Sequence, residues 1–159
     1  DIVSLDAGVI YKGYHSDAAR TYGVGEISKE AKNLIDVTRE SFFKGVEKAV
    51  PGNRIVDIGR AVQEYAEANG MSVVRPFVGH GIGREMHEDP SVPNYGRLGT
   101  GTRLRAGTVL CVEPMIALGA WQVEILSDGW GAVTVDGKPA AHYENTVVVR
   151  EDGVEILTL

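Results

Sequence analysis

Two helix-length segments lie between a hairpin pattern and a series of short β-prone runs, and this order restricts the fold more than any other feature. Apolar residues recur at helical spacing over residues 28–50 and again over 54–69. Ser28 suits the N-cap of the first helix, Pro51-Gly52-Asn53 is expected to end it, and Gly70 follows the second. The expected apolar faces are Ala31, Leu34, Ile35, Phe42, Val46 and Ala49, then Ile55, Ile58, Val62, Tyr65 and Ala66.

The remaining sequence predicts β-structure. Residues 2–24 are expected to form a hairpin with Lys12-Gly13 at its turn. Glycine and proline are frequent over 79–107, which we predict to be loop. A hairpin, two helices and then antiparallel strands indicate the α+β class. Strands are expected at 72–78, 108–113, 121–127, 131–135, 143–149 and 154–158.

Size and composition favour one soluble domain over residues 1–159. The formal net charge of -6 argues against nucleic-acid binding, which needs clustered Lys and Arg. Cys111 is the only cysteine, and its apolar neighbours predict a small core residue rather than a nucleophile. With no signal-peptide pattern and no long apolar span, we expect a cytoplasmic protein that does not bind membranes.

Asp6 and Asp17 flank the predicted turn. With Lys12-Gly13 at the centre, Asp17 pairs opposite Gly8, and strand alternation places both carboxylates on one face of the hairpin. Like charges at this spacing repel unless one is protonated or a cation joins them. For this pair alone, a turn residue beside a solvated carboxylate is the simpler interpretation.

His80 lies between glycines directly after a predicted strand, and His87 follows seven residues later. The glycines do not fit a dinucleotide-binding loop, and His87-Glu88 does not begin an H-E-x-x-H motif. Glycine beside His80 permits a close backbone approach or a positive φ. Two histidines near such a loop favour a ligand or acid/base role over two surface positions.

Glu113 and Glu144 both lie at β-prone segments. Glu113 ends an apolar run, and Pro114 is expected to stop the strand there. Each glutamate has two interpretations. It could reach water, from a strand end for Glu113 or from the outer face of a strand for Glu144, or it could face inward as a metal ligand.

Four carboxylates and one imidazole would suit two divalent ions such as Co, Mn, Fe or Zn. Two such ions would neutralise the four carboxylates and change the formal charge from -6 to -2. Without cations, carboxylates that share a pocket would have raised pKa values and would destabilise the fold near neutral pH. The candidate ligands are Asp6, Asp17, His80, Glu113 and Glu144.

Several separated strings resemble the pita-bread metallopeptidases, and the type I methionine aminopeptidases in particular. They occur in the family's order over residues 1–159. The resemblance implies a curved antiparallel sheet flanked by helices. The strings are Asp6-Ala7-Gly8, Tyr11-Lys12-Gly13-Tyr14-His15-Ser16-Asp17, Gly79-His80-Gly81-Ile82-Gly83, Met86-His87-Glu88-Asp89-Pro90, Val112-Glu113-Pro114-Met115, Asp128-Gly129-Trp130 and His142-Tyr143-Glu144-Asn145-Thr146.

The resemblance also implies roles for the candidate ligands. Asp6 would bind one ion, Asp17 and Glu144 would bridge two, and His80 and Glu113 would complete the other. A metal-bridged hydroxide would be the nucleophile, because metal binding lowers the pKa of water to about 7. Glu113 would shuttle the proton. The substrate would be the N-terminal methionine of peptides or nascent chains.

Three further residues match positions near the substrate. His87 would donate a hydrogen bond to the developing oxyanion. Met86 and Trp130 would line the methionine pocket, with ordinary core packing as the alternative for Trp130. Many relatives have an aromatic ring where Met86 stands, so the pocket shape is expected to differ.

Relatives of this type have a further stretch before the point that matches Asp1. That stretch contributes a substrate-side histidine, part of the methionine pocket and part of the first half-domain. His15 belongs to the hairpin motif and does not replace that histidine. We therefore expect a catalytic domain that lacks its N-terminal side, with reduced or absent turnover unless the segment is supplied.

Two other functions remain open. An X-Pro peptidase of the same superfamily would keep the fold and change the substrate, and the Tyr14 to Thr21 stretch fits it tolerably. A binding module of the same fold would have no turnover. Such modules typically lose metal ligands, whereas all five candidate positions here have competent side chains.

Overall fold

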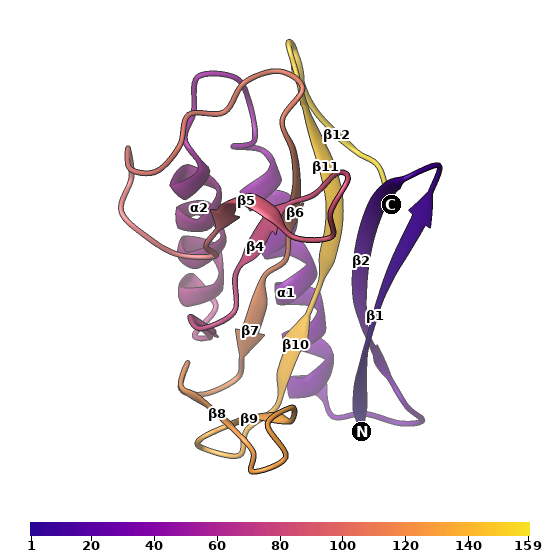
Figure 1. Cartoon of the computed structure of the whole chain (residues 1–159). Coiled ribbons are helices and arrows are strands. Elements are labelled where there is room, and N and C mark those ends of the chain that lie inside the picture. Colours follow the sequence, from indigo (N-terminus) through magenta and orange to yellow (C-terminus); the bar gives the residue numbers. More distant parts are fainter.

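The computed structural model describes residues 1–159 and consists of an antiparallel sheet with two helices on one face (Figure 1). The main sheet has the strand order β1-β2-β11-β6-β4-β5, with β12 paired to β11. Two small sheets, β10-β7-β3 and β8-β9, complete the β-structure, and the predicted α+β class is confirmed. The elements are β1 (Ile2–Tyr11), β2 (Tyr14–Gly23), α1 (Lys29–Val46), α2 (Ile55–Ala68), β3 (Ser72–Val73), β4 (Gly79–Gly81), β5 (Glu88–Val92), β6 (Val109–Val112), β7 (Met115–Ala117), β8 (Val123–Ile125), β9 (Ala132–Thr134), β10 (Ala140–His142), β11 (Glu144–Arg150) and β12 (Gly153–Ile156).

The N-terminal hairpin has the predicted turn and register. Lys12 and Gly13 have φ values of 50° and 80°, the left-handed backbone that a two-residue hairpin turn requires. Gly8 pairs with Asp17, as predicted, and Asp6 pairs with Ala19. Asp6 and Asp17 therefore lie on one face of the hairpin.

Both helices begin close to their predicted positions. The Ser28 hydroxyl accepts a hydrogen bond from the Ala31 amide at 3.1 Å, which caps α1. Helix α1 ends at Val46, so the predicted end at residue 50 is wrong by one turn. Residues 48 and 49 instead form tighter i→i−3 hydrogen bonds. Neither helix is long and apolar enough to span a membrane.

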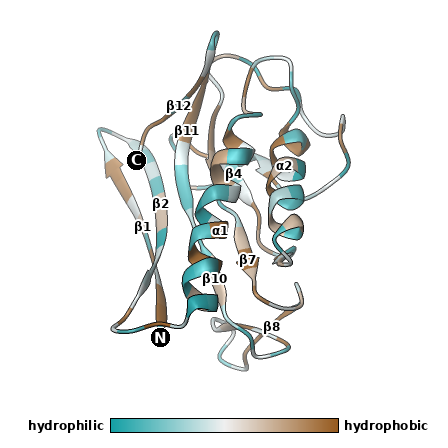
Figure 2. Cartoon of the chain, turned by 180° about the vertical axis from the view of Figure 1, so that it is seen from behind, coloured by the Kyte–Doolittle hydropathy of each residue, from teal (hydrophilic) through white to brown (hydrophobic).

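The helices cover one face of the sheet and bury its apolar residues there. The outward surface of α1 is largely hydrophilic, as Figure 2 shows from the helix side. Strand alternation sends Leu110, Val112, Val147 and Val149 toward the helices. The opposite face of β6 and β11 therefore displays Cys111, Glu144 and Thr146. The larger core cluster consists of Phe42, Val46, Ala49, Ile55, Ile58, Val92, Leu104, Leu110, Val112, Tyr143, Val147 and Val149.

The prediction that 79–107 is loop throughout was wrong at β4 and β5. Glycine there favours strand packing, because a Cβ at Gly79 would lie 2.3 Å from the Cys111 carbonyl oxygen. A Cβ at Gly81 would lie 2.3 Å from the Asp89 carbonyl oxygen. The run predicted at 72–78 forms only β3, and the short strands β7 and β10 were not predicted. The other predicted strands are confirmed as β6, β8, β9, β11 and β12.

A close approach between α2 and the loop after β5 depends on Gly59. A Cβ at Gly59 would lie 2.0 Å from the Pro93 carbonyl oxygen and 2.7 Å from the Tyr95 amide nitrogen. Between those residues, Asn94 is buried and its side-chain amide donates to the Glu113 carbonyl at 3.0 Å. Gly59 thus lets α2 support the loop that holds the backbone of Glu113.

Replacing Gly59 with Ala is expected to lower the free energy of unfolding by about 1–3 kcal/mol, because backbone atoms must move to admit the methyl group. Urea denaturation would measure the loss. Ala61→Ser, at a half-buried position of the same helix, is the matched control and should change stability by less than about 1 kcal/mol. Equal stability of Gly59→Ala and the unmodified chain would contradict this account of the contact.

Candidate metal centre

Three of the predicted ligands lie in one row across the sheet face opposite the helices. Asp6 pairs with Ala19, and Ala19 pairs with Glu144. Residues that pair directly share a face, so the Asp6 and Glu144 carboxylates point the same way. Glu113, the first residue after β6, reaches the other side of Glu144, and their carboxylate oxygens lie within 4.8 Å of each other.

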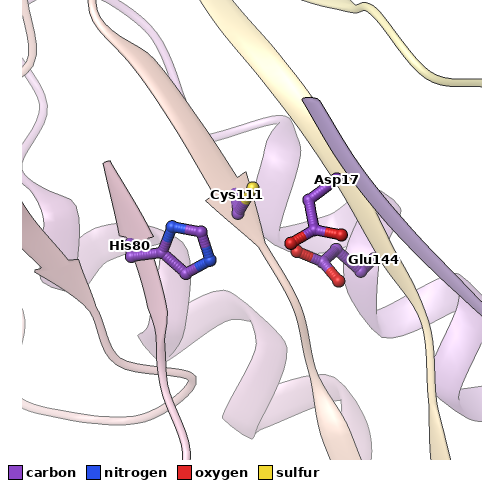
Figure 3. Close-up of side chains that lie close together, drawn as sticks. All are labelled: Asp17, His80, Cys111 and Glu144. Carbon is purple, nitrogen blue, oxygen red and sulfur yellow. The ribbon is translucent and has the colours of Figure 1, made fainter. Parts of the chain in front are cut away.

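The neighbouring row supplies Asp17 and His80. Thr146 pairs with Cys111, and Cys111 pairs with His80. The Asp17 amide donates to the Thr146 hydroxyl at 2.8 Å, which ties β2 to β11 at this level. Figure 3 shows the Asp17 and Glu144 carboxylates side by side, with the His80 ring directed toward them. Five side chains from five separate segments thus converge on this face.

Three carboxylates of this cluster, those of Asp17, Glu113 and Glu144, are destabilised as anions. Burial and the nearby Glu144 charge raise the pKa of Glu113 to about 9. Burial and the Asp17 charge raise the pKa of Glu144 to about 8, and burial followed by the Asp6 charge raises the pKa of Asp17. The Glu144 side chain is only 1% exposed, and its Oε1 has no hydrogen-bond partner. A buried carboxylate oxygen without a donor is the environment that a cation would satisfy.

The His80 ring is held in one orientation by a backbone carbonyl. Its Nδ1 lies 2.8 Å from the Gly81 carbonyl oxygen, which can only accept a hydrogen bond. Nδ1 therefore donates that hydrogen bond, and Nε2 is directed toward Glu113 Oε1 at 3.5 Å. A backbone carbonyl bonded to the other ring nitrogen commonly fixes the orientation of a metal-binding histidine.

The cluster fits divalent cations by its donor chemistry and its spacing. Ligand atoms of Asp17, His80, Cys111 and Glu144 all lie within 4.8 Å of one another. Cys111 is fully buried, as predicted for a core residue, and burial raises the pKa of its thiol. A protonated thiol is a poor ligand, so the oxygen atoms and the imidazole are the effective donors.

One member of the cluster, His142, was not predicted from the sequence. Its ligand atom lies within 4.8 Å of those of Glu113 and Glu144. Strand alternation contained the signal, because His142 is two residues before Glu144 and shares its face. Unlike His80, His142 has no flanking glycine, so the sequence around it gave no separate sign of a ligand.

Two of the predicted substrate-side residues lie beside the cluster. The His87 ring centroid is 4.4 Å from that of His80, and His87 is exposed, so it can reach a ligand above the cluster. The Met86 methyl group packs on β1, where a Cβ at Gly8 would lie 2.2 Å from it. Gly8 therefore makes room for Met86 on the strand that holds Asp6.

Trp130 is placed differently. It lies at the turn between β8 and β9 and is 91% exposed, so the alternative of ordinary core packing is wrong. Its amide donates to the Asp128 carboxylate at 2.9 Å, which orders the turn without burying the indole. Trp130 is not packed against the carboxylate cluster, and its place in a methionine pocket stays a prediction.

Comparison with known proteins identifies the family to which this chain belongs. The model of metallopeptidase family M24 matches residues 1–151. The chain belongs to metallopeptidase family M24. Membership in a metallopeptidase family, together with the convergent donors, supports a divalent-metal site in this chain.

The M24 relatives include methionine aminopeptidases. The chain is 62% identical to the methionine aminopeptidase of Clostridium perfringens over its whole length, which is 64% of that relative. It superposes on methionine aminopeptidase from Thermotoga maritima with a TM-score of 0.97 and 51% identity, covering 99% of this chain and 64% of that one. The chain therefore spans about 64% of the length of these relatives.

A prolidase is a more distant structural match. The prolidase from Pyrococcus horikoshii OT3 superposes with a TM-score of 0.79 and 28% identity, covering all of this chain and 40% of that one. Matches to methionine aminopeptidase and prolidase confirm the expected pita-bread fold for this M24 chain. The resemblance to type I methionine aminopeptidases is confirmed as well.

Proposed function

We propose that residues 1–159 form the catalytic domain of a methionine aminopeptidase, which removes the N-terminal methionine from nascent polypeptides in the cytoplasm. The observation behind this proposal is the convergence of five candidate ligand side chains on one sheet face. Identity to methionine aminopeptidases reaches 62%, against 28% for the prolidase match, which supports methionine release over X-Pro cleavage.

Two divalent ions, of Co, Mn, Fe or Zn, would occupy the cluster. Asp6 would bind one ion, His80 and Glu113 would bind the other, and Asp17 and Glu144 would bind both. Four carboxylates and one imidazole match the donors that these metals accept. When bound, the ions would lower the pKa of a water to about 7 and polarise the scissile carbonyl.

The protein residues would move the proton and hold the substrate. Glu113 would accept the proton of the attacking water and pass it to the leaving amine. The exposed His87 would donate a hydrogen bond to the oxyanion that develops on the carbonyl. Met86 and Trp130 would contact the methionine side chain, for which a thioether and an indole are suitable apolar partners.

The direct test is release of methionine from the peptide Met-Ala-Ser by this chain with Mn or Co added. Release of methionine, with little cleavage of an X-Pro peptide, would support the proposal. Preferred cleavage of the X-Pro peptide would support the prolidase-like alternative instead. If chelator-treated protein neither contains nor binds divalent ions, a binding module is the better description.

Replacing His87 with Ala is expected to slow methionine release by about 10²–10³-fold, because one oxyanion donor is lost. Metal content should stay the same, since His87 is not among the proposed ligands. Metal analysis beside steady-state kinetics would separate the two effects. His15→Ala is the matched control on β2, outside the cluster. A kcat unchanged in His87→Ala would remove this role.

One observation favours a second description, a domain that needs a further segment for turnover. Strand β1 is an edge strand of the sheet, and nearly all its residues are exposed. Leu5, Val9, Ile10 and Tyr11 are between 58% and 70% exposed. Figure 2 shows apolar stretches of β1 along this outer edge. Long apolar edges of this kind are normally paired or covered.

We propose that a segment corresponding to the part of the relatives outside the match covers this edge, in cis or in trans. The chain alone would then bind metal and release methionine slowly. Fusing that segment from a relative before Asp1 should raise kcat and leave metal content unchanged. The same kcat with and without the segment would argue against this description.

A further inference from the structure

His142 lies in the next row of the sheet face that displays Glu144. The two residues are separated by one position, so alternation directs both side chains to the same face. The Thr21 hydroxyl holds the backbone of His142 on both sides. It accepts from the His142 amide at 2.8 Å and donates to the His142 carbonyl at 2.9 Å. His142 also pairs with Met115 on β7, so its backbone is fixed from two directions.

The His142 imidazole faces two of the proposed ligands without bonding either. Its Nε2 lies 3.7 Å from Glu113 Oε2 and 4.0 Å from Glu144 Oε2. Both separations are too long for a hydrogen bond. The side chain is 14% exposed, and Nε2 has no other partner. A buried imidazole nitrogen without a partner, aimed between two carboxylates, indicates that a third species belongs there.

The separations are those of ligands around one cation. Metal–ligand bonds of about 2.0–2.2 Å place neighbouring donor atoms about 3–4 Å apart. The separations of the nitrogen from the two carboxylate oxygens meet that condition, and ligand atoms of the three residues all lie within 4.8 Å of one another. Glu144, which is almost completely buried, has its Oε1 without a partner in the same cluster. Two buried polar atoms without a hydrogen-bond partner in one cluster support the binding of a cation there.

We propose that His142 is a further metal ligand, which forms a triad of donors with Glu113 and Glu144. The inference rests on the proposed metal site and extends it from one imidazole to two. Imidazole donors favour Co, Fe, Ni and Zn over Mn, which prefers oxygen. His142 would therefore increase the preference of this site for Co and Zn relative to Mn.

Replacing His142 with Ala is expected to weaken Co binding by about tenfold or more, and Mn binding by less. Isothermal titration calorimetry of the metal-free chain would measure both affinities. The visible absorption bands of the Co protein should also change, because they report the donor atoms. His142→Gln is the second variant, since an amide fills the space without an imidazole nitrogen. His15→Ala, which removes a histidine outside the cluster, is the control and should leave affinities and spectrum unchanged.

Unchanged Co affinity and an unchanged Co spectrum in both His142 variants would overturn the proposal. So would a change confined to the KM for peptides. His142 also borders an apolar pocket with Phe77, Met115 and Val123, and such a result would assign it to that pocket wall. These measurements use metal alone. Loss of Co affinity in a chain that never releases methionine would therefore support the triad while contradicting the proposed function.

Discussion

Replacement of Asp17 with Asn is expected to reduce bound Mn or Co from two ions per chain to at most one. Asp17 is buried between Asp6 and the Glu144 carboxylate, where one side chain would bind both ions. An amide keeps the shape of the carboxylate but loses its charge and one ligand oxygen. Glu144→Gln should have the same result, because Glu144 lies between Asp17 and Glu113.

Metal analysis after dialysis against Mn or Co would count the ions, and methionine release should fall below detection in both variants. Asp36→Asn is the matched control. Asp36 pairs with Lys32 on the exposed surface of α1, where its side chain is 55% exposed. Two ions per chain in Asp17→Asn and Glu144→Gln would remove the case for a bridged site. Stoichiometry of one in the unmodified chain would do the same.

The hairpin and its two aspartates could be predicted because the relevant physics is local. A two-residue turn at Lys12-Gly13 fixes the register, and the register fixes which side chains share a face. The helices were predictable for the same reason, since caps and apolar periodicity are local signals. Thr38 interrupts the predicted stripe of α1, yet it is buried because its hydroxyl donates to the Leu34 carbonyl at 2.7 Å.

Glu113 and Glu144 had two interpretations in the sequence, and only long-range pairing decided between them. A glutamate in a β-prone run can face water or the interior. Glu144 is inside because β2 and β6 flank β11 on both sides. Those neighbours come from distant parts of the chain, so no local pattern specifies them. His142 differs, because its alternation with Glu144 is a local pattern. That pattern became informative only once Glu144 was placed inside, and β10 belongs to a separate small sheet that meets the cluster at its end.

The strands β4 and β5 were missed because their signal resembles that of a loop. Glycine was interpreted as a mark of turns, although here it allows backbones to approach closely. Pro90 in β5 also favoured a loop in the prediction, but β5 is the last strand of its sheet. Proline is tolerated at an edge, where an amide donor is not needed on one side.

The metal-free chain is expected to lose stability as the pH rises from 7 to 8, and bound metal should abolish that loss. Glu113 and Glu144 have folded pKa values of about 9 and about 8, against an ordinary value of 4.5. Above pH 4.5 the unfolded chain has released both protons while the folded chain still retains them. The free energy of unfolding therefore falls with pH until the folded groups also ionise.

The interval from pH 7 to 8 reports mainly on the raised carboxyl groups of the cluster. Burial and then the Asp6 charge raise the pKa of Asp17 from 3.8, so its contribution has the same sign as that of the two glutamates. Burial lowers the pKa of His142 from 6.5, which makes stability rise with pH, but only below about 6.5. Hydrogen bonds from the Arg54 and Gly99 amides lower the pKa of Asp57 from 3.8. Its contribution to the free energy of unfolding therefore changes with pH only in acid, well below pH 7. Burial raises the pKa of the Cys111 thiol from 9.0. This thiol therefore affects the free energy of unfolding only at a pH above the interval from 7 to 8.

A fall of about 1–2 kcal/mol between pH 7 and 8 is expected, because each fully affected group contributes at most about 1.4 kcal/mol per pH unit. Urea denaturation in the presence of a chelator would measure it, with Co- or Mn-loaded protein compared at the same pH values. Bound divalent ions would stabilise the ionised carboxylates, so the loaded protein should show no fall. The double variant Glu113→Gln, Glu144→Gln, which has no carboxyl group to titrate at either position, should show a clearly smaller fall without metal. A metal-free chain whose stability is constant or rises between pH 7 and 8 would mean that these two carboxyl groups are not held in the buried, mutually repelling arrangement that a cation would relieve.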